Sequence, residues 1–237
     1  MTGGGYFFAV CVDKSAFAVY HCFVFLQAEF MGFDLYDIVA LLIVVTIHEY
    51  SHALVAYKLG DPTAKLAGRI SLNPLAHLDP VGTLMILFAH IGWGKPVPVN
   101  PSYFKQPKRD QALTALAGPF SSLVLAFLMA LIIKYFGLWL PGPLGTFSEK
   151  FFVMSLGLFI FNMFPFPPLD GSKIVGIFVP QRFQRIYQNY LRNGTLYFVI
   201  FLVLDQFVLA RFFNYSILGD VIGKLFTFFE TLLFLGN

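Results

Sequence analysis

The sequence is poor in charged residues. Its 237 residues include 16 Lys and Arg and 13 Asp and Glu, which together make up 12% of the chain, about half of what a soluble domain carries. Apolar residues make up 57%, and 30 residues are Phe. So few polar side chains could not cover the surface of a water-soluble monomer. The composition therefore excludes a soluble globular domain and predicts a protein that lies in the lipid bilayer.

Cysteine and basic runs are scarce as well. Cys11 and Cys22 are the only two cysteines, and their spacing is not that of a metal-binding pair. They exclude a disulfide framework and a zinc ribbon. No basic run is longer than Lys108-Arg109, so we expect no nucleic-acid partner.

Long apolar segments predict the fold. Five of them are candidate spans, at residues 35–58, 112–138 (opening near Gly118-Pro119), 151–164, 196–209 and 217–235. Residues 81–93 are apolar too, but 13 residues suit a re-entrant segment better than a span. Residues 65–72 alternate weakly, as a short strand or hairpin would. We therefore expect an all-α membrane protein. It would be a polytopic bundle of about five to six transmembrane segments with a re-entrant segment and a short membrane-associated β-hairpin or sheet.

The charges predict the orientation of the chain. With residues 81–93 re-entrant, eleven Lys and Arg fall on one side of the membrane and three on the other, and basic loops face the cytoplasm. We expect a multi-pass protein of the cell membrane. Residues 1–30 are interpreted as an N-terminal extension before Met31, and residues 31–237 as a single intramembrane domain. The eleven residues are Lys58, Lys65, Arg69, Lys95, Lys105, Lys108, Arg109, Lys173, Arg182, Arg185 and Arg192.

A His-Glu-x-x-His motif lies within the first span, at residues 48–52. Helical residues four apart share a face, so His48 and His52 can bind one metal ion, and Glu49 can take a proton from a water molecule beside it. Ionisable groups at membrane depth are costly and usually functional. The motif predicts a zinc site in which the metal acidifies water.

Catalytic zinc usually has three protein ligands. The candidates for the third are His77, Asp79, His90, Glu149 and Asp170. Glu149 falls on the wrong side by the charge count, whereas Asp170 follows a Pro-rich break in an apolar segment, on the side of His52. A helix N-cap is the alternative role for Asp170. From the residues alone Asp170 is favoured over Asp79, but the choice stays open.

These motifs together resemble the site-2 proteases, the zinc metalloproteases that cut within membranes (peptidase M50). The resemblance is carried by the motif at 48–52, by Gly118-Pro119, and by the pattern Asn162…Pro165…Leu169-Asp170-Gly171. It covers about residues 32–235 and is closest to small prokaryotic members without a PDZ domain. One departure is Ser122, where the family often has Asn in Gly-Pro-x-x-Asn.

The resemblance implies a function and a role for each matching residue. His48, His52 and Asp170 would bind one zinc ion per chain, Glu49 would be the catalytic base, and Asn162 would bind the substrate backbone or the oxyanion. The substrates would be single-span membrane proteins, and the active site would lie toward the cytoplasmic side. Two alternatives are a membrane metal-ion transporter and a non-catalytic relative that binds membrane proteins.

Overall fold

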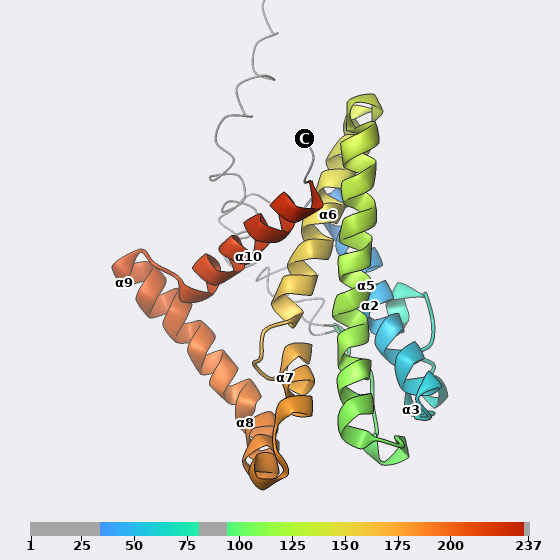
Figure 1. Cartoon of the computed structure of the whole chain (residues 1–237). Coiled ribbons are helices and arrows are strands. Elements are labelled where there is room, and N and C mark those ends of the chain that lie inside the picture. The colour runs from blue at the N-terminus through green and yellow to red at the C-terminus, as the bar shows by residue number, and fades with distance from the viewer. Residues whose placement is uncertain (1–33, 81–93, 235–237) are drawn as a thin grey trace, which may run out of the picture.

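The computed structural model describes residues 34–80 and 94–234, and these form helices without a sheet (Figure 1). Four helical runs among them are long and apolar enough to cross a membrane. They are α2 (Leu35–Lys58), α5 (Pro107–Phe136), α6 (Gly142–Asn162) and Gln181–Phe213, which includes α8 (Gln184–Val203). The prediction of an all-α membrane protein is thus confirmed. The predicted count of five to six spans is not.

Shorter elements connect and follow these helices. The predicted span at 217–235 corresponds to α10, a helix of 17 residues. The predicted re-entrant segment at 81–93 and the predicted N-terminal extension at 1–30 lie outside the described residues. The remaining elements are α3 (Thr63–Leu66), η1 (Pro74–Ala76), η2 (Pro101–Tyr103), η3 (Gly137–Trp139), α7 (Asp170–Val175), η4 (Gly176–Phe178), η5 (Gln181–Phe183), the π-helical η6 (Leu204–Ala210), α9 (Arg211–Phe213) and α10 (Ile217–Leu233).

Helix α2 has the bounds that the sequence predicts. Asp34 caps it, because its side chain accepts from the Asp37 backbone N–H while the Asp37 side chain accepts from the Asp34 N–H. This reciprocal pair satisfies two N–H groups that a helix start otherwise leaves free. The helix ends before Gly60, whose φ of +109° favours glycine. Lys150 of α6 lies 3.0 Å from the Asp34 carboxylate and 2.6 Å from that of Asp37, which ties α6 to the start of α2.

Helices α5 and α6 begin earlier than predicted. Pro107 occupies the first turn of α5, where its missing N–H costs nothing, and the Asp110 carboxylate accepts from the Gln106 N–H at 3.0 Å. The prediction that this span opens near Gly118-Pro119 is wrong, since both residues lie inside α5. Helix α6 starts at Gly142 rather than near residue 151, with a proline in its first turn, and its charged turn at Lys150 lies inside the helix.

The predicted hairpin at residues 65–72 is wrong. The carboxylate of Asp61 accepts from the Thr63 N–H at 2.9 Å and starts the short helix α3 there, and Gly68 turns the chain with a φ of +68°. Within the described residues the only β-type pairing is an isolated bridge between Leu78 and Gly94. The backbone N–H groups of Ala67, Gly68 and Arg69 donate to the carbonyls of Thr63, Lys65 and Ala64, as in a helical turn and not as in a hairpin.

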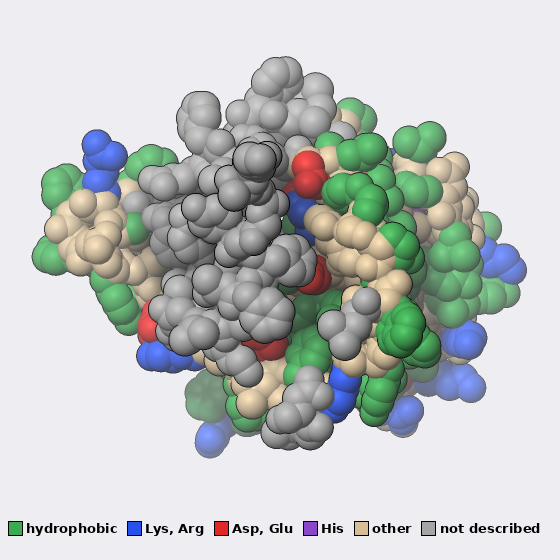
Figure 2. All heavy atoms as spheres, turned by 90° about the horizontal axis from the view of Figure 1, so that it is seen from above, with side chains coloured by type: hydrophobic (Ala, Val, Ile, Leu, Met, Phe, Trp, Pro, Cys, Tyr) green, Lys and Arg blue, Asp and Glu red, His purple; other side chains and the backbone are tan. Residues whose placement is uncertain are grey.

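The core lies where α2, α5 and α6 pack together, and α10 reaches across to α6 (Figure 1). Phe152 of α6 meets Phe226 of α10 edge to face, with ring centroids 6.2 Å apart. Helix α8 leans away from this core in Figure 1. Large apolar side chains remain on the outer surface over many elements (Figure 2), as lipid contact requires. The buried residues of the larger cluster are Ala126, Ala130, Phe152, Leu156, Phe159, Ile160, Leu218, Ile222 and Phe226.

Candidate metal centre

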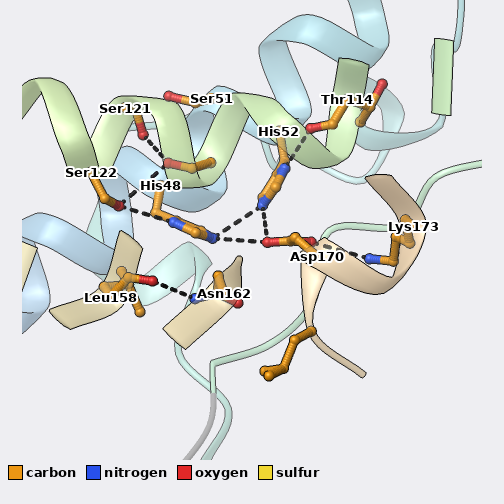
Figure 3. A network of polar contacts seen from close by, with 12 residues as sticks. His48, Ser51, His52, Thr114, Ser121, Ser122, Leu158, Asn162, Asp170 and Lys173 are labelled. Carbon is orange, nitrogen blue, oxygen red and sulfur yellow. Dashed lines mark hydrogen bonds and ion pairs between the residues drawn. The ribbon is translucent and has the colours of Figure 1, made fainter. Parts of the chain in front are cut away.

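Three side chains from two distant parts of the chain meet inside the helical core (Figure 3). His48 and His52 are one turn apart on α2, and both are buried. Asp170 is the first residue of α7 and is buried as well. The structure thus brings together the three residues that were predicted as metal ligands. Within residues 34–80 and 94–234 no other His, Cys, Asp or Glu joins this group.

The Pro-rich break after α6 delivers Asp170 to the histidines. Leu169 is the N-cap of α7, so the alternative N-cap role for Asp170 is wrong. The next residue has to be glycine, because a Cβ at Gly171 would lie 2.3 Å from the Met163 carbonyl oxygen. The segment between α6 and α7 folds back tightly onto the end of α6, and this holds Asp170 beside the histidines.

The ligand atoms are spaced as a tetrahedral metal ion requires. The Asp170 Oδ2 atom lies 3.3 Å from His48 Nε2 and 3.0 Å from His52 Nε2, and the two nitrogens are 3.1 Å apart. Two ligands on a tetrahedral zinc ion at the usual bond lengths would be about 3.3 Å apart. The two imidazoles and one carboxylate are also a donor set typical of catalytic zinc, with a fourth position left for water. These residues therefore fit zinc.

The second nitrogen of each imidazole is also bonded. His52 Nδ1 lies 2.7 Å from the Thr114 carbonyl oxygen, and His48 Nδ1 lies 3.1 Å from Ser122 Oγ. Both partners belong to α5. A carbonyl can only accept, so His52 carries its proton on Nδ1 and presents the lone pair of Nε2 to the metal position. Such partners fix the orientation of metal-binding histidines.

Helix α5 approaches the histidines so closely that residue 118 must lack a side chain. A Cβ at Gly118 would lie 2.3 Å from His52 Nε2 and 2.6 Å from His48 Nε2. Atoms do not approach that closely without a bond, so any larger residue would displace the imidazoles. The Gly118 part of the sequence motif thus has a direct steric explanation.

Comparisons with known proteins find relatives of this chain. The model of peptidase family M50 matches residues 138–205, which contain Asp170. YwhC of Bacillus subtilis, a protein named as a zinc metalloprotease, is 39% identical over 202 residues, which cover 81% of this chain and 91% of YwhC. Rip2 of Mycolicibacterium smegmatis carries a similar name and is 27% identical over 74% of this chain and 69% of its own. No solved structure matches.

The chain belongs to peptidase family M50. Membership in M50 and the His-His-Asp group make it a zinc metalloprotease of the site-2 protease type, with zinc as its cofactor. This agrees with the function that the sequence predicts. Neither the transporter nor the non-catalytic relative gains support.

The other ligand candidates lie elsewhere in this M50 peptidase. His77 is buried, but its Nε2 lies 2.8 Å from the Ser71 carbonyl and its Nδ1 faces Arg69. Glu149 is exposed near the start of α6. Asp79 is not part of the ligand group, and His90 lies outside the described residues. The choice that the residues left open between Asp79 and Asp170 is therefore made by the fold.

Lys173 lies beside the outer oxygen of Asp170, with Nζ 3.3 Å from Oδ1 (Figure 3). The positive charge of Lys173 favours the ionised form of the Asp170 carboxylate. This is the form in which a carboxylate binds a metal ion. A sequence signal for Lys173 existed in its spacing of three residues from Asp170, but the sequence analysis did not use it.

Two residues with predicted catalytic roles flank the ligands. Glu49 is half-buried on α2, between the two histidines in sequence. Burial lowers the pKa of Arg69, and the negative charge of Glu49 opposes that shift, so the two charges lie within electrostatic reach. Asn162 is the last residue of α6, and its Nδ2 donates to the Leu158 carbonyl at 3.1 Å (Figure 3). An asparagine amide has two N–H donors and one acceptor oxygen, so one N–H and the oxygen of Asn162 can still bond to a ligand.

Proposed function

We propose that this M50 peptidase hydrolyses peptide bonds of single-span membrane proteins, within or near their membrane segments. The observation that carries the proposal is the depth of the ligand group. His48 and His52 lie inside α2, one of the apolar runs long enough to cross a membrane, and Asp170, which is itself buried, reaches them from the Pro-rich break after α6. Non-helical backbone at membrane depth is tolerated only where protein or water surrounds it.

In this proposal each residue has one role. His48, His52 and Asp170 hold the zinc ion, which when bound acidifies water and polarises the scissile carbonyl. Glu49 takes a proton from the attacking water and returns it to the leaving amine nitrogen. The Asn162 amide donates to the substrate backbone or to the developing oxyanion. Asn162 would have to give up its bond to Leu158, or use its second hydrogen.

The substrate must reach the site with its backbone unwound. In a helix the scissile carbonyl is already bonded within its own segment, so a membrane segment weakened by Gly, Pro or Asn is the preferred class. The structure offers such a strand a non-helical neighbour at residues 94–100. A Cβ at Gly94 would lie 3.7 Å from Val45 Cγ1, and Val45 is one turn before Glu49 on α2. Substrate that pairs with this segment would pass the catalytic base.

Arg69 holds this neighbouring segment in place. Its guanidinium donates to the Pro96 carbonyl at 2.9 Å and also to the carbonyl of Lys95, while the Lys95 N–H donates to the His77 carbonyl at 2.9 Å. Asn100 is fixed further along, since its N–H donates to the buried Asp61 carboxylate at 2.7 Å. A fixed, non-helical segment beside α2 supports an extended substrate.

The experiment compares two single-span substrates that differ only at their centre, one with Gly-Pro and one with Leu-Leu. With the purified protein in detergent and zinc, we expect the Gly-Pro substrate to be cut about 10-fold faster or more, because Gly and Pro lower the cost of unwinding by about 1–3 kcal/mol each. A zinc chelator should stop the cut, and added zinc should restore it. Equal rates, or cleavage that persists in chelator, would contradict the proposal.

We further propose that the active site faces the cytoplasm. The support is the charge bias, since basic loops stay in the cytoplasm. The end of α2 and the start of α5 belong to the basic side, and the start of α6 to the other.

A pair of single cysteines tests this orientation, in a chain with Cys11 and Cys22 replaced by Ser. Lys105 and Thr146 are both exposed, one before α5 and one near the start of α6. A membrane-impermeant maleimide should label Thr146→Cys in intact cells and Lys105→Cys only in inverted vesicles. The opposite pattern would reverse the orientation.

A further inference from the structure

We propose that Ser122 is a positioning residue, which fixes the tautomer and ring orientation of His48 for metal binding. This inference rests on the proposed role of His48 as a zinc ligand. Ser122 lies on α5, its side chain is fully buried, and its Oγ is 3.1 Å from His48 Nδ1. The opposite ring nitrogen, Nε2, faces His52 and Asp170.

The hydrogen bonds around Ser122 have one consistent direction. His48 binds metal through the lone pair of Nε2, so its proton is on Nδ1 and is donated to Ser122 Oγ. The hydroxyl then donates its own proton to the Gly118 carbonyl, 3.3 Å away. A neutral imidazole with its proton on the wrong nitrogen would break this chain. Ser122 therefore favours the tautomer that leaves Nε2 free for zinc.

Comparison with other hydroxyls shows that Ser122 is drawn toward His48. Ser and Thr inside helices commonly donate to the carbonyl four residues earlier. Thr46, Ser51 and Ser148 do so at 2.6, 2.7 and 2.8 Å. Ser122 makes the same bond at 3.3 Å and is the one of these four with a histidine nitrogen within hydrogen-bond distance. Its hydroxyl oxygen lies closer to His48 Nδ1, at 3.1 Å, than to the carbonyl oxygen of its own helix, at 3.3 Å.

The short side chain suits this packing. Gly118, one turn before Ser122, lets α5 approach the imidazoles until no Cβ fits between them. At that separation a hydroxyl one carbon from the backbone is long enough to reach His48 Nδ1. This accounts for the departure at residue 122, because Ser122 can support the ligand without a longer amide.

The test is Ser122→Ala, with Ser155→Ala as a matched control. Ser155 is an equally buried hydroxyl on the adjacent helix α6, and its Oγ has no hydrogen-bond partner among the described residues. Zinc affinity is measured by competition with a chelator, and the visible spectrum is recorded with Co²⁺ in place of zinc. Loss of such a supporting partner typically costs 10–100-fold in metal affinity.

We expect Ser122→Ala to bind zinc about 10–100-fold more weakly and to shift the Co²⁺ bands. Ser155→Ala should stay within about 3-fold of wild type, and Ser122→Thr, which keeps the hydroxyl, should recover most of the affinity. Wild-type affinity and spectrum in Ser122→Ala would overturn this inference alone, as would equal losses in Ser122→Ala and Ser155→Ala, which would indicate packing. A wild-type protein without bound zinc would overturn the proposed function together with it.

Discussion

Glu49→Gln is expected to lower kcat about 10²–10⁴-fold, the usual contribution of a general base, while one zinc ion per chain stays bound. The substitution keeps the shape of the side chain but removes its ability to take a proton. The ligand group of His48, His52 and Asp170 does not include Glu49, so the metal centre should remain intact. The measurements are single-turnover cleavage of the Gly-Pro substrate and zinc content of the same preparation.

Two further variants make this result specific. Glu149→Gln is the matched control, because Glu149 is an exposed carboxylate near the start of α6, and it should cleave at the wild-type rate. Asp170→Asn should instead lose zinc and activity together, since it weakens a ligand. A Glu49→Gln enzyme with wild-type kcat would exclude Glu49 as the base, and one that loses zinc would move Glu49 into the metal centre.

The sequence predicted a helix best where its end signals are local. Helix α2 has its predicted bounds because Asp34, Asp37 and Gly60 are neighbours of the helix ends in the chain. The early turns of α6 were missed because the charge of Lys150 is paired with carboxylates more than 110 residues away. Distant pairing of this kind leaves no periodic signal in a sequence.

The same division applies to the site. The spacing of His48 and His52 on one helical face is local, so the sequence alone predicted that pair. Asp170 lies far along the chain; the residues alone favoured it over Asp79 without deciding, and the resemblance to the site-2 proteases selected it before the fold placed it beside the histidines. The partner of His52 is a backbone carbonyl, that of Thr114, which every residue type supplies and which no sequence pattern can reveal. Ser122 was noted as a departure, but its contact with His48 was not predicted.

The second large effect is expected from Gly118→Ala, which should abolish zinc binding at chelator concentrations that leave the wild type loaded. The new methyl carbon would lie 2.3 Å from His52 Nε2 and 2.6 Å from His48 Nε2. Either α5 moves away from α2 or the imidazoles rotate, and both changes separate the ligand atoms from Asp170. We expect a loss of at least about 100-fold in zinc affinity, the upper range for a disturbed ligand shell.

Gly223→Ala on α10 is the matched control for this substitution. Gly223 is also a buried helical glycine, but a Cβ there would meet nothing within 4 Å. Alanine in a helix is favoured over glycine by about 1 kcal/mol, so Gly223→Ala should raise Tm slightly and leave zinc affinity unchanged.

Comparing Gly118→Ala with Gly223→Ala distinguishes the effect of a collision with the metal ligands from the effect of helix propensity. Both alanines favour the helical backbone equally, and only the one at residue 118 collides with ligand nitrogens. In Gly118→Ala, α5 would have to move away from the histidines to relieve the collision, and this movement would break the 2.7 Å contact between His52 Nδ1 and the Thr114 carbonyl of α5. Wild-type zinc affinity in Gly118→Ala would therefore contradict the prediction. It would show that the close approach of α5 to α2 is not what holds the histidines in place.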